Sequence, residues 1–153
     1  MEKKLVIMAG LPGSGKSYVR SNRYADMRVI DCDEIKKTLP GYDPKNPCAV
    51  HEASKIIEAQ EIHKALGNGE SFVYDTTATN WAKLVKMIAD AQAIGYKVEL
   101  CYVKVSLATA MSRNAKRERV VPEALIREKF ALLPTSLEVL SGYVDTYTVV
   151  NND

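Results

Sequence analysis

The sequence of 153 residues lacks the features of a secreted or membrane-bound protein. Its three cysteines, Cys32, Cys48 and Cys101, are odd in number and widely spaced, which indicates neither a disulfide framework nor a zinc site. No apolar run approaches the length of a membrane span, and the first residues do not follow the pattern of a signal peptide. We therefore expect a cytoplasmic, intracellular protein with no membrane partner.

Features of specialised nucleotide or nucleic-acid binding are also scarce. Aromatic residues make up 7% of the chain and are scattered, so they predict no platform on which bases would stack. The net charge is only +2, which permits a nucleic-acid partner without requiring one. There is no Asn-Lys-x-Asp segment of the kind that specifies guanine in GTPase switches. No internal repeat or linker is visible, so residues 1–153 are expected to form a single domain, whose oligomeric state the sequence leaves open.

The clearest feature present is a phosphate-binding loop near the amino terminus. An apolar run at residues 5–8 predicts a strand buried on both faces, and the following residues match the pattern G-x-x-x-x-G-K-[ST] without a gap. Glycines let backbone N–H groups approach phosphate oxygens, and the next helix adds the positive end of its dipole. The pattern predicts ATP as the ligand, with the lysine on its β- and γ-phosphates and the serine hydroxyl on Mg²⁺. The loop residues are Gly10, Leu11, Pro12, Gly13, Ser14, Gly15, Lys16 and Ser17.

Strand-like and helix-like segments alternate along the rest of the chain. Further strands are predicted at residues 28–31, 71–75, 96–105 and 146–150, and helices at about 16–24, 33–37, 50–66, 80–94, 107–116 and 122–132, with another helix starting at Pro134. This alternation is typical of a parallel sheet that is covered on both faces. The expected fold class is α/β: a P-loop kinase-like three-layer sandwich with five parallel strands in the order 2-3-1-4-5, flanking helices and a helical lid.

The end of the second strand carries candidate residues for an acceptor substrate. Sites in parallel sheets lie beyond the carboxyl ends of the strands, so residues 31–36 should face the same crevice as the phosphate-binding loop. Asp33 is the predicted general base, which takes the proton of the attacking hydroxyl. It would also suit the N-cap of the following short helix, and the two roles are compatible. Lys36, one turn later, is either a contact for an anionic acceptor or a solvated surface lysine.

The end of the third strand adds a second group of polar residues at the same edge. Asp75 would orient the acceptor or hold Mg²⁺ through a water molecule. Thr76 and Thr77 would donate hydrogen bonds to the acceptor, or would form the turn before the next helix.

A basic segment late in the chain is the candidate lid, at about residues 113–121. Arg113 and Arg117 are four residues apart, so on a helix they share one face. A basic run is usually a solvated helix face. Because this run follows the helix after the fourth strand, we favour an arginine clamp on the transferred phosphoryl group, with Lys116 and Arg119 as weaker candidates.

Together these residues predict a phosphotransferase that moves the γ-phosphate of ATP to a hydroxyl group. The catalytic candidates are Lys16, Asp33 and Arg117, and the base is expected to act on the acceptor alone. A non-catalytic nucleotide-binding module is the alternative outside enzymes. The sequence leaves ATP versus GTP preference open.

Four segments of the chain resemble the kinase domain of phage polynucleotide 5′-kinases: residues 10–17, DEIK at 33–36, VYDTT at 73–77 and RNAKR at 113–117. The resemblance implies a polynucleotide 5′-hydroxyl of DNA or RNA as acceptor, and is consistent with a phage-encoded protein. Lys36 stands where that family has an arginine on the acceptor phosphate, and it cannot form the same bidentate pair. The family's phosphatase domain is absent. The implied roles are phosphate and metal binding for Lys16 and Ser17, general base for Asp33, acceptor placement for Asp75, ATP-phosphate contact for Arg117 and support in the lid for Arg113.

A second resemblance is to the zeta-toxin kinases, which phosphorylate UDP-N-acetylglucosamine. It rests on DEI at residues 33–35, LPGYD at 39–43, VHEAS at 50–54 and DTT at 75–77. It implies the same base, Asp33, and places Glu52 near a sugar nucleotide. Zeta-toxin kinases are generally longer than this chain. The two resemblances share the reaction and differ in the acceptor. We expect the 5′-hydroxyl end of a nucleic acid as the acceptor, with a sugar nucleotide or other small molecule as the alternative.

Overall fold

The computed structural model describes residues 2–117 and 120–153. The strands are β1 (Lys3–Ala9), β2 (Arg28–Asp31), β3 (Phe72–Asp75), β4 (Tyr96–Lys104) and β5 (Thr146–Asn151). The helices are α1 (Lys16–Arg23), α2 (Cys32–Lys36), the 3₁₀ helix η1 (Pro47–Val50), α3 (His51–Gly67), α4 (Trp81–Ala93), α5 (Leu107–Ala115) and α6 (Glu123–Ser141). None of the helices in this described part is long and apolar enough to cross a membrane.

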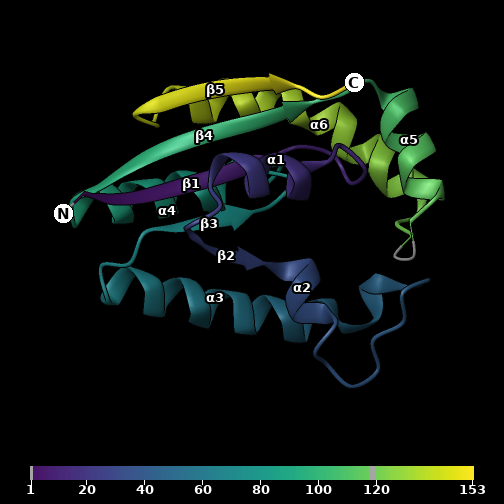
Figure 1. Ribbon diagram of the computed structural model, residues 1–153, viewed down its shortest axis with the longest axis horizontal. Coiled ribbons are helices and arrows are strands. Elements are labelled where there is room, and N and C mark those ends of the chain that lie inside the picture. Colours follow the sequence, from purple (N-terminus) through teal and green to yellow (C-terminus); the bar gives the residue numbers. More distant parts are fainter. Residues whose placement is uncertain (1, 118–119) are drawn as a thin grey trace.

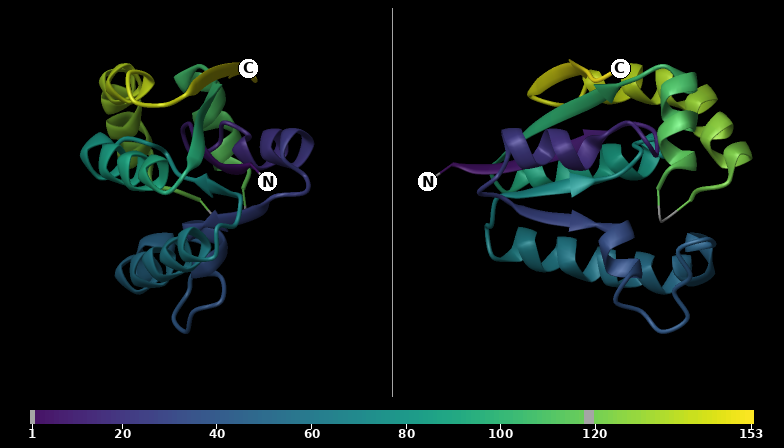
Figure 2. Two further views of the ribbon diagram at one scale, coloured as in Figure 1. Left: turned by 90° about the vertical axis from the view of Figure 1, so that its left-hand side faces the viewer. Right: turned by 45° about the vertical axis from the view of Figure 1, so that its right-hand side comes forward.

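The strands form one parallel sheet in the order β2-β3-β1-β4-β5, which confirms the predicted topology (Figure 1). β1 lies at its centre, and Leu5, Val6, Ile7 and Met8 are completely buried. Figure 2 shows α1 on one face of the sheet, with α3, α4 and α6 on the other. Because both faces of β1 are covered, its sequence is continuously apolar instead of alternating.

The register of the sheet brings the functional segments to one edge. Asp31 in β2 pairs with Asp75 in β3, and Asp75 in turn pairs with Met8, close to the end of β1. The phosphate-binding loop, the start of α2 and the segment after β3 therefore leave the sheet side by side at its carboxyl edge.

Two predictions about helices need correction. The short helix begins at Cys32, because the Asp31 carboxylate caps it by accepting a hydrogen bond from the backbone N–H of Asp33 at 2.9 Å. The predicted end at residue 132 and new start at Pro134 are wrong, since α6 continues through Pro134. Leu133 and Leu137, which flank the proline, are buried in the core, and this packing maintains the helix although proline lacks an N–H.

Candidate active site

The phosphate-binding loop between β1 and α1 packs against α5 and the segment after β5. Gly13 has a φ of 87°, and a Cβ at this position would lie 2.4 Å from the carbonyl oxygen of Ala110. Gly15 has a φ of 86°, and its Cβ would lie 2.3 Å from the side-chain nitrogen of Asn152. Both positions therefore require glycine for conformation, and Gly13 also requires it for space, because its neighbour is backbone. The tightly packed loop has the composition and curvature with which backbone N–H groups surround a phosphate.

The start of α1 is suited to an anion. Its N-cap, Gly15, offers no side-chain cap, and the first turn contains no acidic residue, so the first N–H groups and the helix dipole are not neutralised locally. Ser17 is exposed at this end. The Ser14 hydroxyl is completely buried and is the one such side-chain atom without a hydrogen-bond partner in the described part of the chain. The Lys16 ammonium lies 2.9 Å from the carbonyl oxygen of Gly10. Triphosphate oxygens would supply the acceptors that these groups lack.

An arginine that the sequence analysis missed connects two strand ends beneath the loop. Nη1 of Arg20 donates hydrogen bonds to Asp31 at 2.8 Å and to Asp75 at 2.6 Å. The second oxygen of Asp75 lies 3.8 Å from the Lys16 ammonium. The spacing of Lys16 and Arg20, one helical turn apart, is the signal that places both on one face of α1.

The environment of Asp75 alters its protonation. Burial raises the pKa of Asp75 to about 6, with further increases from the carboxylates of Asp31 and Asp33 and an opposing effect of Lys16 and Arg20. The predicted base, Asp33, and the predicted phosphate-binding Lys16 both lie near Asp75 at this edge of the sheet. The Lys16 ammonium is close to Asp75 itself, and the N–H of Asp33 is bonded to Asp31, the sheet neighbour of Asp75. Asp75 is thus largely ionised at neutral pH, although it is buried.

The short helix α2 presents Asp33 and Lys36 beside this cluster. Asp33 is half-buried in the first turn. Lys36 is only 6% exposed, which excludes the alternative of a solvated surface lysine. Burial lowers the pKa of His51 at the start of α3, and the ammonium groups of Lys36 and Lys55 lower it further. Lys36 and Lys55 thus lie near His51 together with the carboxylate of Glu58, which raises this pKa.

The segment after β3 is folded into a tight turn. The Thr76 hydroxyl accepts a hydrogen bond from the backbone N–H of Ala78, which has a φ of 65°. The hydroxyls of Thr77 and Thr79 lie 3.4 Å apart, and the Lys129 ammonium donates to Thr79 at 3.3 Å. Thr76 thus shapes the turn before α4, as one of the two sequence-based alternatives predicted, while Lys129 brings a charge from α6 to this edge.

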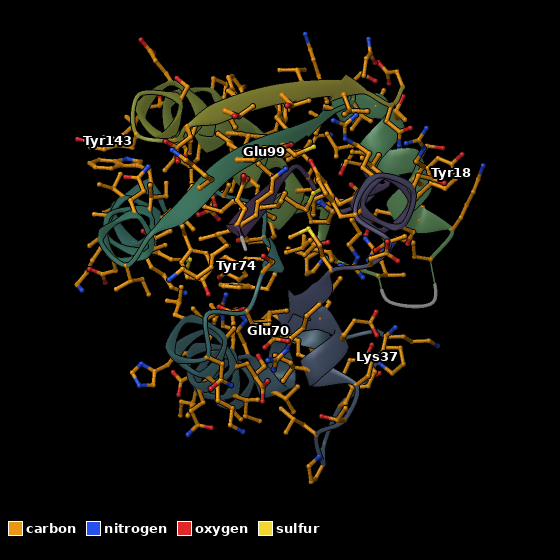
Figure 3. All side chains as sticks on the ribbon, turned by 60° about the vertical axis from the view of Figure 1, so that its left-hand side comes forward. Tyr18, Lys37, Glu70, Tyr74, Glu99 and Tyr143 are labelled. Carbon is orange, nitrogen blue, oxygen red and sulfur yellow. The ribbon has the colours of Figure 1, made fainter. Side chains whose placement is uncertain are left out.

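A buried carboxylate on α3 is the second residue that the sequence analysis missed. Glu58 is 1% exposed and accepts a hydrogen bond at 2.6 Å from the hydroxyl of Tyr74. Tyr74 is labelled in Figure 3. Lys83 and Lys55 place their ammonium groups 3.3 and 3.4 Å from it. Burial and the neighbouring Glu58 raise the pKa of Tyr74, so its hydroxyl remains a donor. Glu52, in contrast, is exposed on the first turn of α3.

Arg113, a predicted lid residue, contacts the back of the phosphate-binding loop. It donates to the carbonyl oxygen of Ser14 at 3.3 Å and to that of Asn152 at 2.8 Å. The Asn152 side chain also donates to Ser14, at 2.8 Å. These bonds fix the loop to α5 and to the end of β5.

The two ends of the predicted lid are joined by Asn114, which is buried. Its side chain donates to the carbonyl oxygen of Val121 at 2.7 Å and accepts from the Val121 N–H at 3.0 Å. Arg117 follows α5 and is half-buried, and its backbone N–H donates a hydrogen bond to the carbonyl oxygen of Asn114. Val120 donates to Pro44, which links the lid to the loop before α3. The weaker candidate Arg119 lies outside the described residues.

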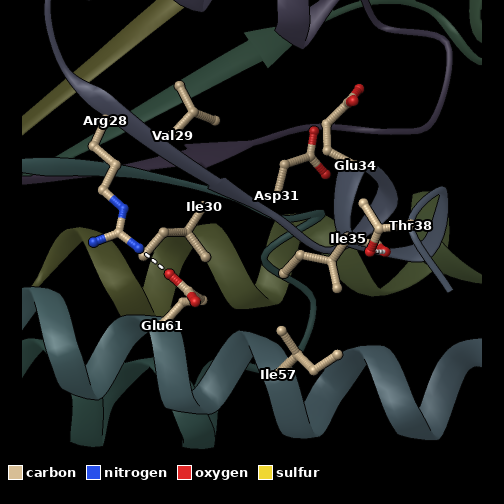
Figure 4. Close-up of a pocket in the computed structure, with 9 residues that line it drawn as sticks. All are labelled: Arg28, Val29, Ile30, Asp31, Glu34, Ile35, Thr38, Ile57 and Glu61. Carbon is tan, nitrogen blue, oxygen red and sulfur yellow. Dashed lines mark hydrogen bonds and ion pairs between the residues drawn. The ribbon is translucent and has the colours of Figure 1, made fainter.

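A pocket of about 240 Å³ lies beside the site, between β2, α2 and α3 (Figure 4). Asp31 contributes to its wall, but neither Lys16 nor Asp75 does. Arg28 bridges Glu61 and Glu70 at the far end of β2. The pocket and this bridge are therefore separate from the phosphate-binding loop.

The residues present fit Mg²⁺ only when phosphates accompany it. In the described residues no group of three or more His, Cys, Asp or Glu side chains could hold a metal. The Ser17 hydroxyl is exposed at the start of α1, and Asp75 is occupied by Arg20, which leaves it a contact through water. This donor set suits a cation that keeps several waters and binds substrate phosphates.

Comparisons with known proteins show which family model and which solved structures this chain matches. The model of the family described as Zeta toxin matches residues 1–153. A chain of the AvrRxo1-ORF1:AvrRxo1-ORF2 complex is similar with a TM-score of 0.83 in the structure with sulphate ions and 0.80 in the structure with ATP. In both cases the identity is 17%, and the match covers 98% of this chain and 55% of that chain.

Two further solved structures share the fold. A chain from the PezAT chromosomal toxin–antitoxin system of Streptococcus pneumoniae has a TM-score of 0.78 at 14% identity, covering 99% of this chain and 70% of that chain. A chain of the Pnkp1/Rnl/Hen1 RNA repair complex has a TM-score of 0.68 at 21% identity, covering 90% of this chain and 46% of that chain. The fold of this chain is therefore that of P-loop kinases, and it spans about half of the AvrRxo1 chain that it matches.

Proposed function

The chain belongs to the zeta toxin family, and from this premise we propose that it is an ATP-dependent kinase that phosphorylates a hydroxyl group. The observation that carries the proposal is the convergence at one sheet edge of Lys16, 3.8 Å from Asp75, with Asp33 on the adjacent helix. This arrangement joins a triphosphate site to a carboxylate that can receive a proton. Residues 1–153 act in this proposal as one domain.

The donor side binds ATP through the phosphate-binding loop. Backbone N–H groups of residues 13–17 surround the phosphates, and Lys16 leaves the carbonyl oxygen of Gly10 to bind the β- and γ-phosphates. When bound, Mg²⁺ neutralises negative charge on these phosphates. Ser17 would hold the ion directly and Asp75 through a water molecule. Arg117 clamps the transferred phosphoryl group, and Arg113 supports the loop from behind.

The acceptor side activates a hydroxyl group. The hydroxyl oxygen forms a bond to the γ-phosphorus while the bond to the β,γ-bridging oxygen breaks, and ADP leaves with that electron pair. Asp33 takes the hydroxyl proton. Asp75, Thr76 and Thr77 orient the acceptor, and Lys36 attracts its negative charge.

For the acceptor, we rank a sugar nucleotide or similar anionic small molecule first. The zeta toxin model matches the complete sequence, and the positively charged Lys36 is buried instead of lying on an open surface. The 5′-hydroxyl end of a polynucleotide is the second candidate, supported by the similarity to a chain of the Pnkp1/Rnl/Hen1 RNA repair complex.

The test is phosphoryl transfer from γ-labelled ATP and, in parallel, from GTP. The acceptors are UDP-N-acetylglucosamine, N-acetylglucosamine, nucleosides and 5′-hydroxyl oligonucleotides of DNA and RNA, with Lys16→Ala as the inactive control. Label on the sugar nucleotide alone supports the first candidate, and label on the oligonucleotides alone supports the second. ATP binding without labelling of any acceptor would contradict the kinase and favour a non-catalytic nucleotide-binding module.

A further inference from the structure

Arg20 joins two carboxylates that would otherwise repel each other. Asp31 and Asp75 end adjacent parallel strands in direct register, and their residues are 8% and 7% exposed. Two buried carboxylates at this spacing are unfavourable unless a cation lies between them. Nη1 of Arg20 supplies that cation, with bonds of 2.8 and 2.6 Å.

Each of these carboxylates uses its other oxygen on a different side of the site. Oδ1 of Asp75 faces the Lys16 ammonium at 3.8 Å. Oδ1 of Asp31 accepts the N–H of Asp33 at 2.9 Å and so fixes the first turn of α2. Arg20 is therefore the shared partner in a chain of contacts from Lys16 through Asp75 and Asp31 to Asp33.

We propose that Arg20 is a positioning residue that sets the phosphate-binding Lys16 and the base Asp33 in register with each other. The inference rests on the proposed kinase function and deepens it. In this proposal Arg20 acts through the two strand-end carboxylates that its Nη1 binds, and not on the reacting atoms. It acts by holding the donor side, on α1, and the acceptor side, on α2, at one fixed separation.

The chain contains a matched control. Arg28 also bridges two carboxylates, Glu61 and Glu70, but at the opposite end of β2. Figure 4 shows its contact with Glu61. Arg20→Gln and Arg28→Gln each remove one guanidinium from such a bridge. Arg20→Lys keeps a cation that can reach both carboxylates, because a single nitrogen makes both bonds in the native site.

The first measurement is steady-state transfer at neutral pH, with kcat and KM determined separately. We expect Arg20→Gln to lower kcat about 10²-fold with little change in KM for ATP, since misplacing reacting groups by about 1 Å costs this much. Arg20→Lys should recover most of the rate, and Arg28→Gln should behave as wild type. Equal losses in Arg20→Gln and Arg28→Gln, or no recovery in Arg20→Lys, would overturn the proposal.

The second measurement does not depend on turnover. Amide hydrogen exchange at Asp33 should accelerate by on the order of tenfold in Arg20→Gln, because the Asp31 carboxylate that accepts this N–H loses its partner. Exchange at Asp33 should not change in Arg28→Gln. If the wild type transfers no phosphoryl group but this exchange pattern is observed, the kinase proposal fails and the linkage stands. If the wild type is active and exchange at Asp33 is unchanged, the linkage fails.

Discussion

The proposed donor side of the site is one continuous stretch, residues 10–17, whereas the proposed acceptor side is assembled from α2, the end of β3, α3 and α6. The first would act through backbone groups that glycine conformations fix locally. The second would act through side chains that meet only after folding, such as Lys36 with His51 and Lys129 with Thr79. A local stretch can therefore keep one ligand while the assembled side changes its substrate, and variants should affect the two sides separately.

The largest difference between the effect on phosphoryl transfer and the effect on ATP binding is expected at Asp33. Asp33→Ala should lower kcat by about 10³-fold, within the range for loss of a general base, and leave ATP affinity nearly unchanged. Initial rates with γ-labelled ATP and binding of ATP at equilibrium test the two parts. Lys16→Ala is the opposite control, because it should weaken ATP binding itself. Equal losses of ATP binding in the two variants would refute the separation of the sides.

A smaller effect is expected at Arg117, the proposed clamp on the transferred phosphoryl group. Arg117→Ala should lower kcat by about 10²-fold, because a charge that stabilises this group is lost. Lys116→Ala, with its exposed side chain, is the neighbouring control. A rate equal to that of the wild type would show that Arg117 has no part in the clamp.

The parallel sheet could be predicted from the sequence, because alternation of strand and helix and a buried apolar first strand are local patterns. The strand order came with the likeness to P-loop kinases, and the loop consensus predicted where the phosphate-binding loop leaves the sheet. The partners of Asp75 were not predictable in the same way. Arg20, Asp31 and Glu58 become important only when α1, β2 and α3 meet, and in sequence each is an ordinary charged residue. The predicted helix boundary at Pro134 was wrong for the same reason, since the local preference of proline is outweighed by packing of Leu133 and Leu137.

The pH dependence should reveal Asp75, which lies between the two sides. The folded pKa of about 6 is above the ordinary value of 3.8, so the folded state retains a proton that the unfolded chain loses. From this group, the free energy of unfolding falls as pH rises from about 4 to 6, while transfer falls up to about tenfold per pH unit below 6. Denaturation and rate profiles should both lose these slopes in Asp75→Asn. Persistence of the stability slope in that variant would assign it to another group.

The smallest effects are changes in stability expected at two completely buried serines, Ser14 on the donor side and Ser54 on the acceptor side. Ser54 donates to the carbonyl oxygen of His51 at 2.6 Å, whereas the Ser14 hydroxyl has no partner in the described residues. Without nucleotide, Ser14→Ala should therefore stabilise the protein by about 1 kcal/mol, and Ser54→Ala should destabilise it by a similar amount. With ATP the difference in stability between the two variants should become smaller, because Ser14→Ala loses a hydrogen bond to phosphate that is worth roughly tenfold in affinity. Thermal unfolding with and without ATP measures both terms. A lower Tm for nucleotide-free Ser14→Ala would show that the hydroxyl is satisfied within the folded chain, so that the donor side is complete without its ligand.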